Sequence, residues 1–520
     1  MTLAPVSINT DANNAQSAFD QSASELTTAQ RLLWLGQKLA PDSPLYNMAF
    51  LFTLGGEVDV ACFQAAFQGV VDRSDSLRTV ISESGGSAGQ RVLPQLDYVV
   101  EVLDFREKEN PETAVSLWAE QRCQQLFKLS SCLFDAVLIR LPAGKTVWYL
   151  CQHHLITDIA TVRLLFATVS EFYQRAIENT LADAPSLSAY TATRLPMPSE
   201  AAIDYWRQIG EKCEEQSVTL YHRNETQLSE KPSAKTRRVF CELGTERTSA
   251  LKALAMDSEA AALTPALSLF NLVAGILFAY LLRVGVRVDE SSTEAAGKRL
   301  AIATPAHGRP TRALKETLGV FMELFPLLAD VEKGESFASL FSQVSEASGQ
   351  LLRYAEPGAS EVAMRREVSV VLNFIHAKLP DFAGMSVRSE WVHPGAGDPR
   401  HHLRLQVHDF DRRGSLQLHF DFNEDLFDRG LQERAPSHFL ALVDAVLADR
   451  HQLIEDVDLV REKERSHLLS LAKSPVREPV SCSVVTLFEA QVEKTPDAIA
   501  TTCNAQHLTY AQLNAKANQL

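Results

Sequence analysis

The clearest hydrophobic pattern in the chain lies between residues 134 and 172. Two apolar runs, Phe134–Leu141 and Thr146–Cys151, flank the stretch Pro142–Lys145, which contains Pro and Gly. Strand-like runs on either side of such a stretch predict a hairpin. From Ile159 onward, apolar residues recur at helical spacing, at positions 162, 165, 166, 169 and 172. The sequence therefore predicts two paired strands followed directly by a helix.

Upstream of this region the pattern is also mixed. Asn47–Leu54 and Arg91–Leu103 have the composition of strands, and Thr113–Gln125 has that of a helix. Asp59 is placed to cap a helix that continues to about Val71. Alternating strands and helices of this kind are compatible with several α+β folds.

Two further stretches bear on the organisation of the chain. Residues 185–200 combine prolines with Ser and Thr, and we interpret them as a connection between two lobes. Leu263–Leu282 contains twenty residues without a charge, which is long enough to cross a membrane. Because Pro, Ser and Asn interrupt it and no comparable segment occurs elsewhere, we predict a helix buried in the core and no membrane span.

Composition narrows the function classes. The chain has 520 residues and a net charge of −15, which argues against a nucleic-acid partner because such proteins carry a basic stripe. Its eight cysteines show neither a CxxC pair nor metal-ligand spacing, which predicts no metal site and a reducing, cytoplasmic location. Residues 1–20 lack the basic flank and apolar core of a secretory signal, and their polar composition predicts a disordered leader.

Candidate chemistry lies where the predicted hairpin meets the predicted helix. His153 and His154 follow the second strand, and Asp158 comes four residues after His154. A histidine in such a place can accept a proton near neutral pH. The alternative is a pair of loop histidines that only contact solvent, and the pair alone does not decide between the two.

The segment His153–Asp158 resembles the HHxxxDG motif of the condensation domains of nonribosomal peptide synthetases, a fold family shared with chloramphenicol acetyltransferase. Further blocks resemble that family in the order it requires, from about residue 26 to residue 465. They are Leu26–Gln30 with Trp34 and Pro41–Asn47, Arg73–Thr79, His307–Arg309 with Gly319–Phe321 and Leu324–Leu327, and Leu416–Phe427.

This resemblance implies an α+β fold of two chloramphenicol-acetyltransferase-like lobes, arranged as a V-shaped pseudo-dimer with a tunnel at their interface. The expected N-terminal lobe covers residues 21–190 and the C-terminal lobe residues 191–465, followed by a linker over 466–485. Residues 486–520 resemble the start of an adenylation domain, through the blocks Leu487–Gln491, Thr495–Ala500, Leu508–Asn514 and Ala517–Leu520. The nucleotide-binding parts of such a domain are not in the sequence, so no adenylation chemistry is expected from this segment.

The resemblance also implies roles for individual residues. His154 is the catalytic histidine, which either removes a proton from the attacking amine or positions that amine. His153 orients the loop from inside the fold. Asp158 pairs with an arginine of the earlier block, Arg73 or Arg78. Arg309 is a candidate substrate-binding or lobe-bridging arginine, with a plain surface ion pair as the alternative.

Several positions depart from the family's pattern. Ile159 stands where the motif has glycine, and a need for positive φ there would strain a β-branched residue. Ser74-Asp75 replaces the usual His-Glu, and Met322-Glu323 replaces the usual Val-Asn. Ala192 stands in place of an aspartate, and the histidine of the HxxxP block is missing near residues 354–357. Because His154 is retained, these changes favour a divergent subtype over an inactive domain.

The expected activity is amide formation by a starter condensation domain. The donor would be a fatty acyl thioester, on CoA or an acyl carrier protein, because few residues precede the first block. The acceptor would be an aminoacyl group on a downstream carrier domain, next to the adjacent adenylation domain, with no cofactor bound by this domain. The alternatives are an internal condensation domain with a donor carrier docked in trans, and a catalytically silent recruitment platform. A heterocyclization domain is excluded, because it would have an aspartate in place of His153.

Overall fold

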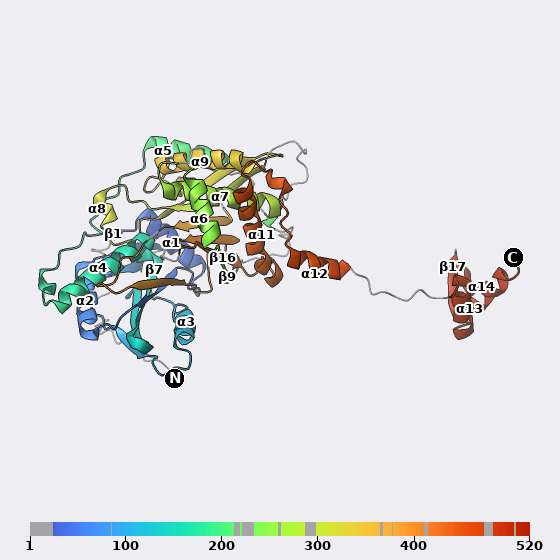
Figure 1. Cartoon of the computed structure of the whole chain (residues 1–520), viewed down its shortest axis with the longest axis horizontal. Helices are drawn as coiled ribbons and strands as arrows, with labels where there is room; N and C mark the ends of the chain where they lie inside the picture. Colours follow the sequence, from blue (N-terminus) through green and yellow to red (C-terminus); the bar gives the residue numbers. More distant parts are fainter. Residues whose placement is uncertain are drawn as a thin grey trace. The chain divides into compact units, whose positions relative to one another are not determined.

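The computed structural model divides the chain into two units, Met1–Leu459 and Val460–Leu520 (Figure 1). The predicted leader over residues 1–20 and residues 473–481 of the predicted linker lie outside the described residues. The structure describes residues 24–84, 86–212, 219–220, 233–257, 262–286, 298–364, 368–376, 378–409, 414–472, 482–503 and 506–520.

The first lobe of unit 1 is built on a five-stranded sheet in which four neighbouring strands are antiparallel and the edge pair β5–β6 is parallel. Helices α2 and α4 cover one face with a large apolar cluster, and α3 covers the other (Figure 1). Strand β7 is buried along its whole length because both faces are covered. In sheet order the strands are β14 (Val387–Val392), β2 (Asn47–Leu54), β7 (Thr146–His153), β6 (Phe134–Arg140) and β5 (Glu101–Asp104), and the helices are α2 (Val60–Arg73), α3 (Pro111–Arg122) and α4 (Ile159–Ile177).

The second lobe holds a separate six-stranded sheet. Helix α7 is the described helix that is long and apolar enough to cross a membrane, and 72% of its most apolar window is buried inside this lobe. The strands are β12 (Glu323–Val331), β11 (Lys298–Ala306), β13 (Val370–Ile375), β15 (Leu403–His408), β16 (Gln417–Asn423) and β9 (Thr236–Glu242), and the helices are α5 (Glu200–Lys212), α6 (Thr245–Ala255), α7 (Pro265–Val284), α8 (Arg312–Lys315), α9 (Phe337–Tyr354), α10 (Ser360–Ala363) and α11 (Arg429–Ala448).

Smaller elements complete unit 1. Helix α1 (Thr28–Leu39) begins with a capping box, in which Thr27 and Gln30 satisfy each other's backbone amides. Strands β1 (Ser24–Glu25), β4 (Ser87–Val92) and β3 (Thr79–Ser84) form a three-stranded sheet, and β8 (Thr219–Leu220) pairs with β10 (Gly285–Val286). The strand predicted over residues 91–103 is wrong in its middle, because β4 ends at Val92 and β5 begins at Glu101 in a different sheet.

The expected lobe boundary at residue 190 is wrong for one segment. Strand β14 comes from the C-terminal half of the chain but pairs with β2 at the edge of the first lobe's sheet. Just before it, Phe382 is fully buried among rings of the first lobe, with centroids 5.3 Å from Tyr173 and 5.6 Å from Phe166. The alternating burial of β14 predicts an edge strand but not the sheet that it joins.

Unit 2 contains α12 (Glu462–Ala472), α13 (Val484–Lys494), the hairpin β17 (Ile499–Cys503) with β18 (Gln506–Thr509), and α14 (Tyr510–Ala517). Helix α12 occupies the first part of the predicted linker, so residues 466–472 are helical. None of the side chains described in α13 and α14 is buried, although the rings of Phe488 and Tyr510 lie 5.9 Å apart. This unit therefore has secondary structure without a core of its own.

We predict that Phe382→Ala destabilises unit 1, although residue 382 belongs to the second half of the chain. Removing a fully buried phenylalanine costs about 3–5 kcal/mol, which denaturant unfolding would measure. Phe240→Ala is the matched control because its ring is 54% exposed. Equal, small effects of both substitutions would show that the crossover segment does not hold the first lobe together.

Candidate functional site

The candidate site is a short turn between strand β7 and helix α4. The strand ends at His153, residues 154–156 form one 3₁₀ turn, and Asp158 caps α4 by accepting a hydrogen bond from the Thr161 amide (2.8 Å). The His154 amide donates to the Tyr46 carbonyl (2.8 Å). The turn is therefore held at one end by the residue before β2 and at the other by α4, as expected for a rigid support of a functional side chain.

His153 points into the protein, as predicted. Its Nδ1 accepts from the Leu155 amide (3.2 Å) and its Nε2 lies 3.2 Å from Oε1 of Gln37, which makes Nε2 the protonated nitrogen. Burial lowers the pKa of His153 to about 3, so the ring stays neutral. Its contacts hold the turn.

His154 faces the other way and lines a cavity. Its Nδ1 is buried and has no hydrogen-bond partner among the described residues, so Nε2 is the nitrogen that faces the cavity. Burial lowers the pKa of His154, the charge of Arg404 adds to this effect, and the charge of Asp158 opposes it. The neutral imidazole is therefore the main form near pH 7.

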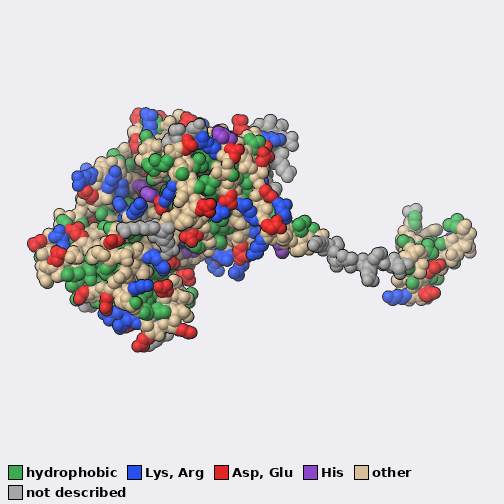
Figure 2. Space-filling model, in the orientation of Figure 1, with side chains coloured by type: hydrophobic (Ala, Val, Ile, Leu, Met, Phe, Trp, Pro, Cys, Tyr) green, Lys and Arg blue, Asp and Glu red, His purple; other side chains and the backbone are tan. Residues whose placement is uncertain are grey.

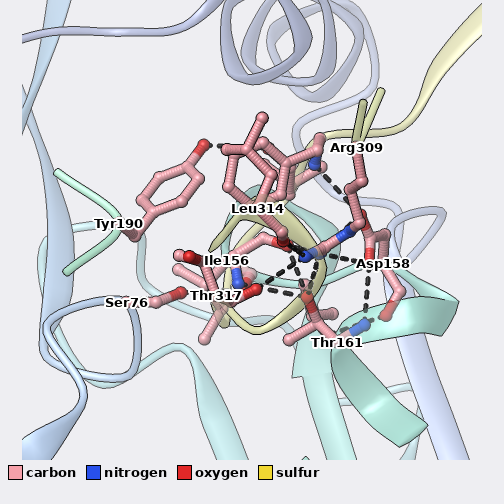
Figure 3. Close-up of polar contacts among 12 residues, drawn as sticks. Ser76, Ile156, Asp158, Thr161, Tyr190, Arg309, Leu314 and Thr317 are labelled. Atoms are coloured by element: carbon pink, nitrogen blue, oxygen red, sulfur yellow. Dashed lines mark hydrogen bonds and ion pairs between the residues drawn. The ribbon is translucent and has the colours of Figure 1, made fainter. Parts of the chain in front are cut away.

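Asp158 makes a buried ion pair with Arg309. Nη2 of Arg309 lies 3.0 Å and 3.1 Å from the two carboxylate oxygens, and both side chains are less than 5% exposed. The second carboxylate oxygen also accepts from the Phe321 amide (3.0 Å). Figure 3 shows the guanidinium between Asp158 and Thr161, with the carbonyls of Leu314 and Thr317 on its other side. Because a buried charge is costly when unpaired, this network fixes its members strongly.

The predicted partners of Asp158 are wrong. Arg73 donates to the Gly69 carbonyl and lies over the Phe172 ring, and Arg78 donates to the carbonyls of Val71, Leu93 and Pro94. Main-chain oxygens therefore take up the hydrogen bonds of both arginines. Their block does support the turn, because Ser76 donates to the Ile156 carbonyl (3.0 Å), but the ion pair comes from the other lobe.

Arg309 bridges the lobes and is not among the side chains that line the cavity. The surface ion pair considered as its alternative is excluded, since Arg309 is 8% exposed. Its Nη2 also donates to the Gly319 carbonyl (2.8 Å). Gly319 has φ +145°, and an added Cβ would lie 2.1 Å from the Tyr190 ring, so glycine is required there.

Ile159 causes no backbone strain. It is the first residue of α4 and is absent from the described residues with positive φ. The possible strain at this position is therefore excluded. The side chain of Ile159 instead lines the cavity beside His154.

The cavity has a volume of about 560 Å³ and lies between the two lobes. The lining residues from α1 and the segment after it are mostly apolar and are called the apolar wall, and those from β9, β15 and residues 393–401 are mostly polar and are called the polar wall. The apolar wall contains Ala29, Leu32, Leu33, Leu35, Leu39, Leu45 and Met48, and the polar wall contains Arg238, His393, Asp398, Arg400, His401, Arg404 and Gln406. His154 and Ile159 lie on its lining from the first lobe.

Sequence reasoning missed two supports of this site. Asp75, in the block that departs from the family pattern, accepts from the amides of Tyr190 and Thr191 (2.8 Å each). Glu323 lines the cavity with its carboxylate bonded to the amides of Gly358 and Ser360, and burial raises its pKa. The one feature of the sequence that could have indicated these two carboxylates is that both stand at positions where the chain departs from the family pattern. Among the described residues, no group of three or more His, Cys, Asp or Glu side chains is placed to hold a metal ion.

Two lobes that meet at a histidine-lined cavity define an acyl-transfer fold of the condensation type. A family model described as the condensation domain matches residues 20–283 and 292–469. The chain therefore belongs to the condensation domains of nonribosomal peptide synthetases, and the α+β two-lobe fold expected from the sequence is confirmed.

Curated relatives of the chain include nonribosomal peptide synthetases. One of the linear gramicidin synthase proteins of Brevibacillus parabrevis is 25% identical over 532 residues, covering 95% of this chain and 6% of that protein. The dimodular nonribosomal peptide synthase of Bacillus subtilis (strain 168) is 24% identical, covering 95% of this chain and 20% of that protein. The chain thus spans a small part of these synthetases.

Among solved structures, a mutant starter condensation domain of rhizomide synthetase RzmA in complex with C8-CoA has a TM-score of 0.69 at 21% identity, covering 85% of this chain and 99% of that chain. The four-domain synthetase AB3403, bound to AMP and glycine, has a TM-score of 0.72 at 16% identity, covering 95% of this chain and 38% of that chain. At these identities the likeness establishes the fold.

We predict that Asp158→Ala lowers both thermal stability and amide formation. The substitution leaves the buried Arg309 guanidinium without its counter-ion, which costs about 3–5 kcal/mol. Glu171→Ala is the control, because its ion pair with Arg175 lies on the surface and should contribute little. If both variants unfold at the wild-type temperature, the ion pair between Asp158 and Arg309 does not stabilise the turn.

Proposed function

We propose that this chain is a starter condensation domain that joins a fatty acyl thioester to the amine of a carrier-bound aminoacyl group. The single observation that carries the proposal is the neutral His154, whose Nε2 faces a cavity with one apolar wall. No cofactor is needed for this reaction, because the thioester already supplies an activated acyl group.

In the proposed reaction the acceptor amine attacks the thioester carbonyl and a C–N bond forms. The tetrahedral intermediate then loses the thiol as the C–S bond breaks, and the amine loses one proton. Nε2 of His154 can accept a hydrogen bond from the neutral amine or take that proton as the intermediate forms. Holding two thioester-linked substrates in one cavity supplies much of the rate, because aligned groups react with large effective molarities.

The apolar wall supports a fatty acyl donor. Leu32, Leu35 and Leu39 are 39%, 46% and 77% exposed although they line the cavity, so this wall reaches an opening to solvent. An acyl chain lying along it would cover these side chains, and each buried methylene contributes about 0.8 kcal/mol. A CoA donor in a related starter domain shows that this fold can hold such a ligand.

The neighbouring parts of the proposed assembly are a downstream carrier domain and an adenylation domain. The family model ends at residue 469, whereas matches covering 95% of the chain (about 494 of 520 residues) must continue beyond it. This continuation supports residues 486–520 as the start of the next domain. In Figure 2, acidic and basic side chains are mixed over the visible face of unit 1, which suits a cytoplasmic protein with protein partners.

An internal condensation domain remains the second candidate, because the relatives include linear gramicidin synthase and other peptide synthases. It would use the same cavity with a peptidyl donor on a carrier protein. A mass-spectrometric assay with an aminoacyl carrier acceptor distinguishes the two, with acyl-CoA, acyl carrier protein and peptidyl carrier protein as competing donors. Product from the peptidyl carrier alone would replace the starter proposal.

We predict that His154→Ala reduces amide formation by about 10²–10⁴-fold while leaving the unfolding temperature close to wild type. The pKa of His154 is lowered, so the wild-type rate should hold steady near pH 7 and fall only as the pH drops through that lowered value, below the usual range for histidine. Steady-state rates from pH 5 to 8 and a thermal melt test both parts. Full activity of the alanine variant would mean that a group other than His154 catalyses the reaction. No activity in wild type would favour the recruitment platform.

We predict that Leu35→Gln weakens the use of octanoyl-CoA more than that of acetyl-CoA. Loss of one leucine contact is worth about 1.5–3 kcal/mol, so kcat/KM for octanoyl-CoA should fall by about tenfold or more. Leu117→Gln is the control, because Leu117 is 55% exposed on α3 and does not line the cavity. Equal losses with both donors would place the acyl chain elsewhere.

A further inference from the structure

The polar wall of the cavity contains one arginine more than its carboxylates can pair. Arg238, Arg400 and Arg404 face the two carboxylates Asp398 and Asp421 on this wall and just behind it. The way in which these five charges pair decides whether every arginine on the wall is neutralised or one remains able to bind an anionic ligand.

Two of the arginines are already paired. Arg238 makes two hydrogen bonds to Asp421, of 2.6 Å and 2.9 Å, and Gln406 adds a third at 2.6 Å. Arg400 makes two side-chain bonds to Asp398, of 3.0 Å and 2.7 Å, and its amide adds another at 3.0 Å. Burial would raise the pKa of both carboxyls, but the neighbouring cationic groups hold each pKa below its usual range, so both stay ionised.

Arg404 is the arginine left over. Among the described residues its guanidinium has no hydrogen bond and no ion pair, and it is not among the buried polar atoms without a partner. Its nitrogens are therefore accessible from the cavity that Arg404 lines. Arg404 and His154 line the same cavity, and the charge of Arg404 contributes to the lowered pKa of His154.

Among the described residues, the carboxylate nearest Arg404 along the sheet is Asp421, which lies opposite Arg404 in the β15–β16 pair and already binds Arg238. Burial lowers the pKa of His393 and of His401 to about 4 each, so neither ring carries a charge near pH 7. Tyr46, which also lines the cavity, has its pKa raised by burial, so its hydroxyl stays protonated and can only add a hydrogen-bond donor beside an anion. The wall therefore holds a net positive charge in a partly enclosed space.

We propose that Arg404 binds a carboxylate of one of the two substrates, and so selects an acidic acceptor side chain or an acyl donor with a terminal carboxylate. An unpaired guanidinium in a partly desolvated cavity favours a carboxylate because it can donate two parallel hydrogen bonds. This inference rests on the proposed amide-forming function and specifies the substrate class that the cavity takes.

Matched substrate pairs test the proposal on the full chain and separate the two sources of the carboxylate. The acceptor arm compares glutamyl with glutaminyl N-acetylcysteamine thioester, with octanoyl-CoA as donor. The donor arm compares adipoyl-CoA with its monomethyl ester, with leucyl N-acetylcysteamine thioester as acceptor. In one of the arms, wild type should prefer the carboxylate about ten- to a hundredfold in kcat/KM.

Substitutions at Arg404 should remove that preference specifically. Arg404→Gln should bring the ratio of kcat/KM for acidic over neutral substrate to within about threefold of one, with kcat/KM for the neutral substrates nearly unchanged. Arg404→Lys should keep part of that ratio, because lysine retains the charge but not the two parallel N–H donors. Arg312→Gln is the control, because Arg312 is 91% exposed on α8 and does not line the cavity.

Four results would overturn the proposal: no preference in either arm, a preference that survives in Arg404→Gln, equal loss with acidic and neutral substrates, or loss with octanoyl-CoA and adipoyl-CoA but not with the octanoyl and adipoyl N-acetylcysteamine thioesters offered as donors in their place. The last result would assign Arg404 to the phosphates of CoA.

If no substrate yields an amide, the proposed function fails, and calorimetric titration with glutarate then decides the binding site. Binding to wild type but not to Arg404→Gln would support it, and equal binding to both would overturn it.

Discussion

The buried ion pair between Asp158 and Arg309 is the contact on which the site depends. Asp158 caps the helix that follows the turn with His154, and Arg309 comes from the loop after a strand of the other lobe. One contact therefore fixes the turn that carries His154 and also the position of one lobe against the other. A charged pair at this place is sensitive to the loss of either member, because the remaining charge would stay buried.

The electrostatics of the cavity follow from the same rule. Asp158, Asp398 and Asp421 each take an arginine, and the carboxylate of Glu323 is held by two backbone amides. Burial keeps His153, His154, His393 and His401 neutral near pH 7. A cavity in which the histidines are neutral and the acids are paired can hold an uncharged amine next to an uncharged base, which amide formation requires.

The sequence predicted local elements well and long-range partners poorly. The strand Asn47–Leu54, the cap at Asp59 and the buried helix near residues 263–282 follow from period and capping residues, and the structure has all three. The arginine that pairs with Asp158 and the sheet that β14 joins depend on contacts between residues more than 150 positions apart. Neither periodicity nor capping encodes such partners, and the family resemblance pointed to Arg73 or Arg78 of the earlier block. Among the described residues the guanidinium of Arg404 has no hydrogen bond or ion pair, and the sequence could not predict this, since the pairing of five charges is visible only in three dimensions.

We propose that the departures from the family pattern reflect substrate choice and not loss of catalysis. Ile159 replaces the motif glycine without straining the backbone, and its side chain lines the cavity together with His154. Asp75 and Glu323 stand at two other departures, and each accepts hydrogen bonds from two backbone amides that are buried or partly buried. An inactive domain is under no constraint to keep a neutral histidine aimed at a cavity with one apolar and one cationic wall. Because the turn stays intact and both Ile159 and Glu323 line the cavity, these changes support the proposal that the domain has altered substrates.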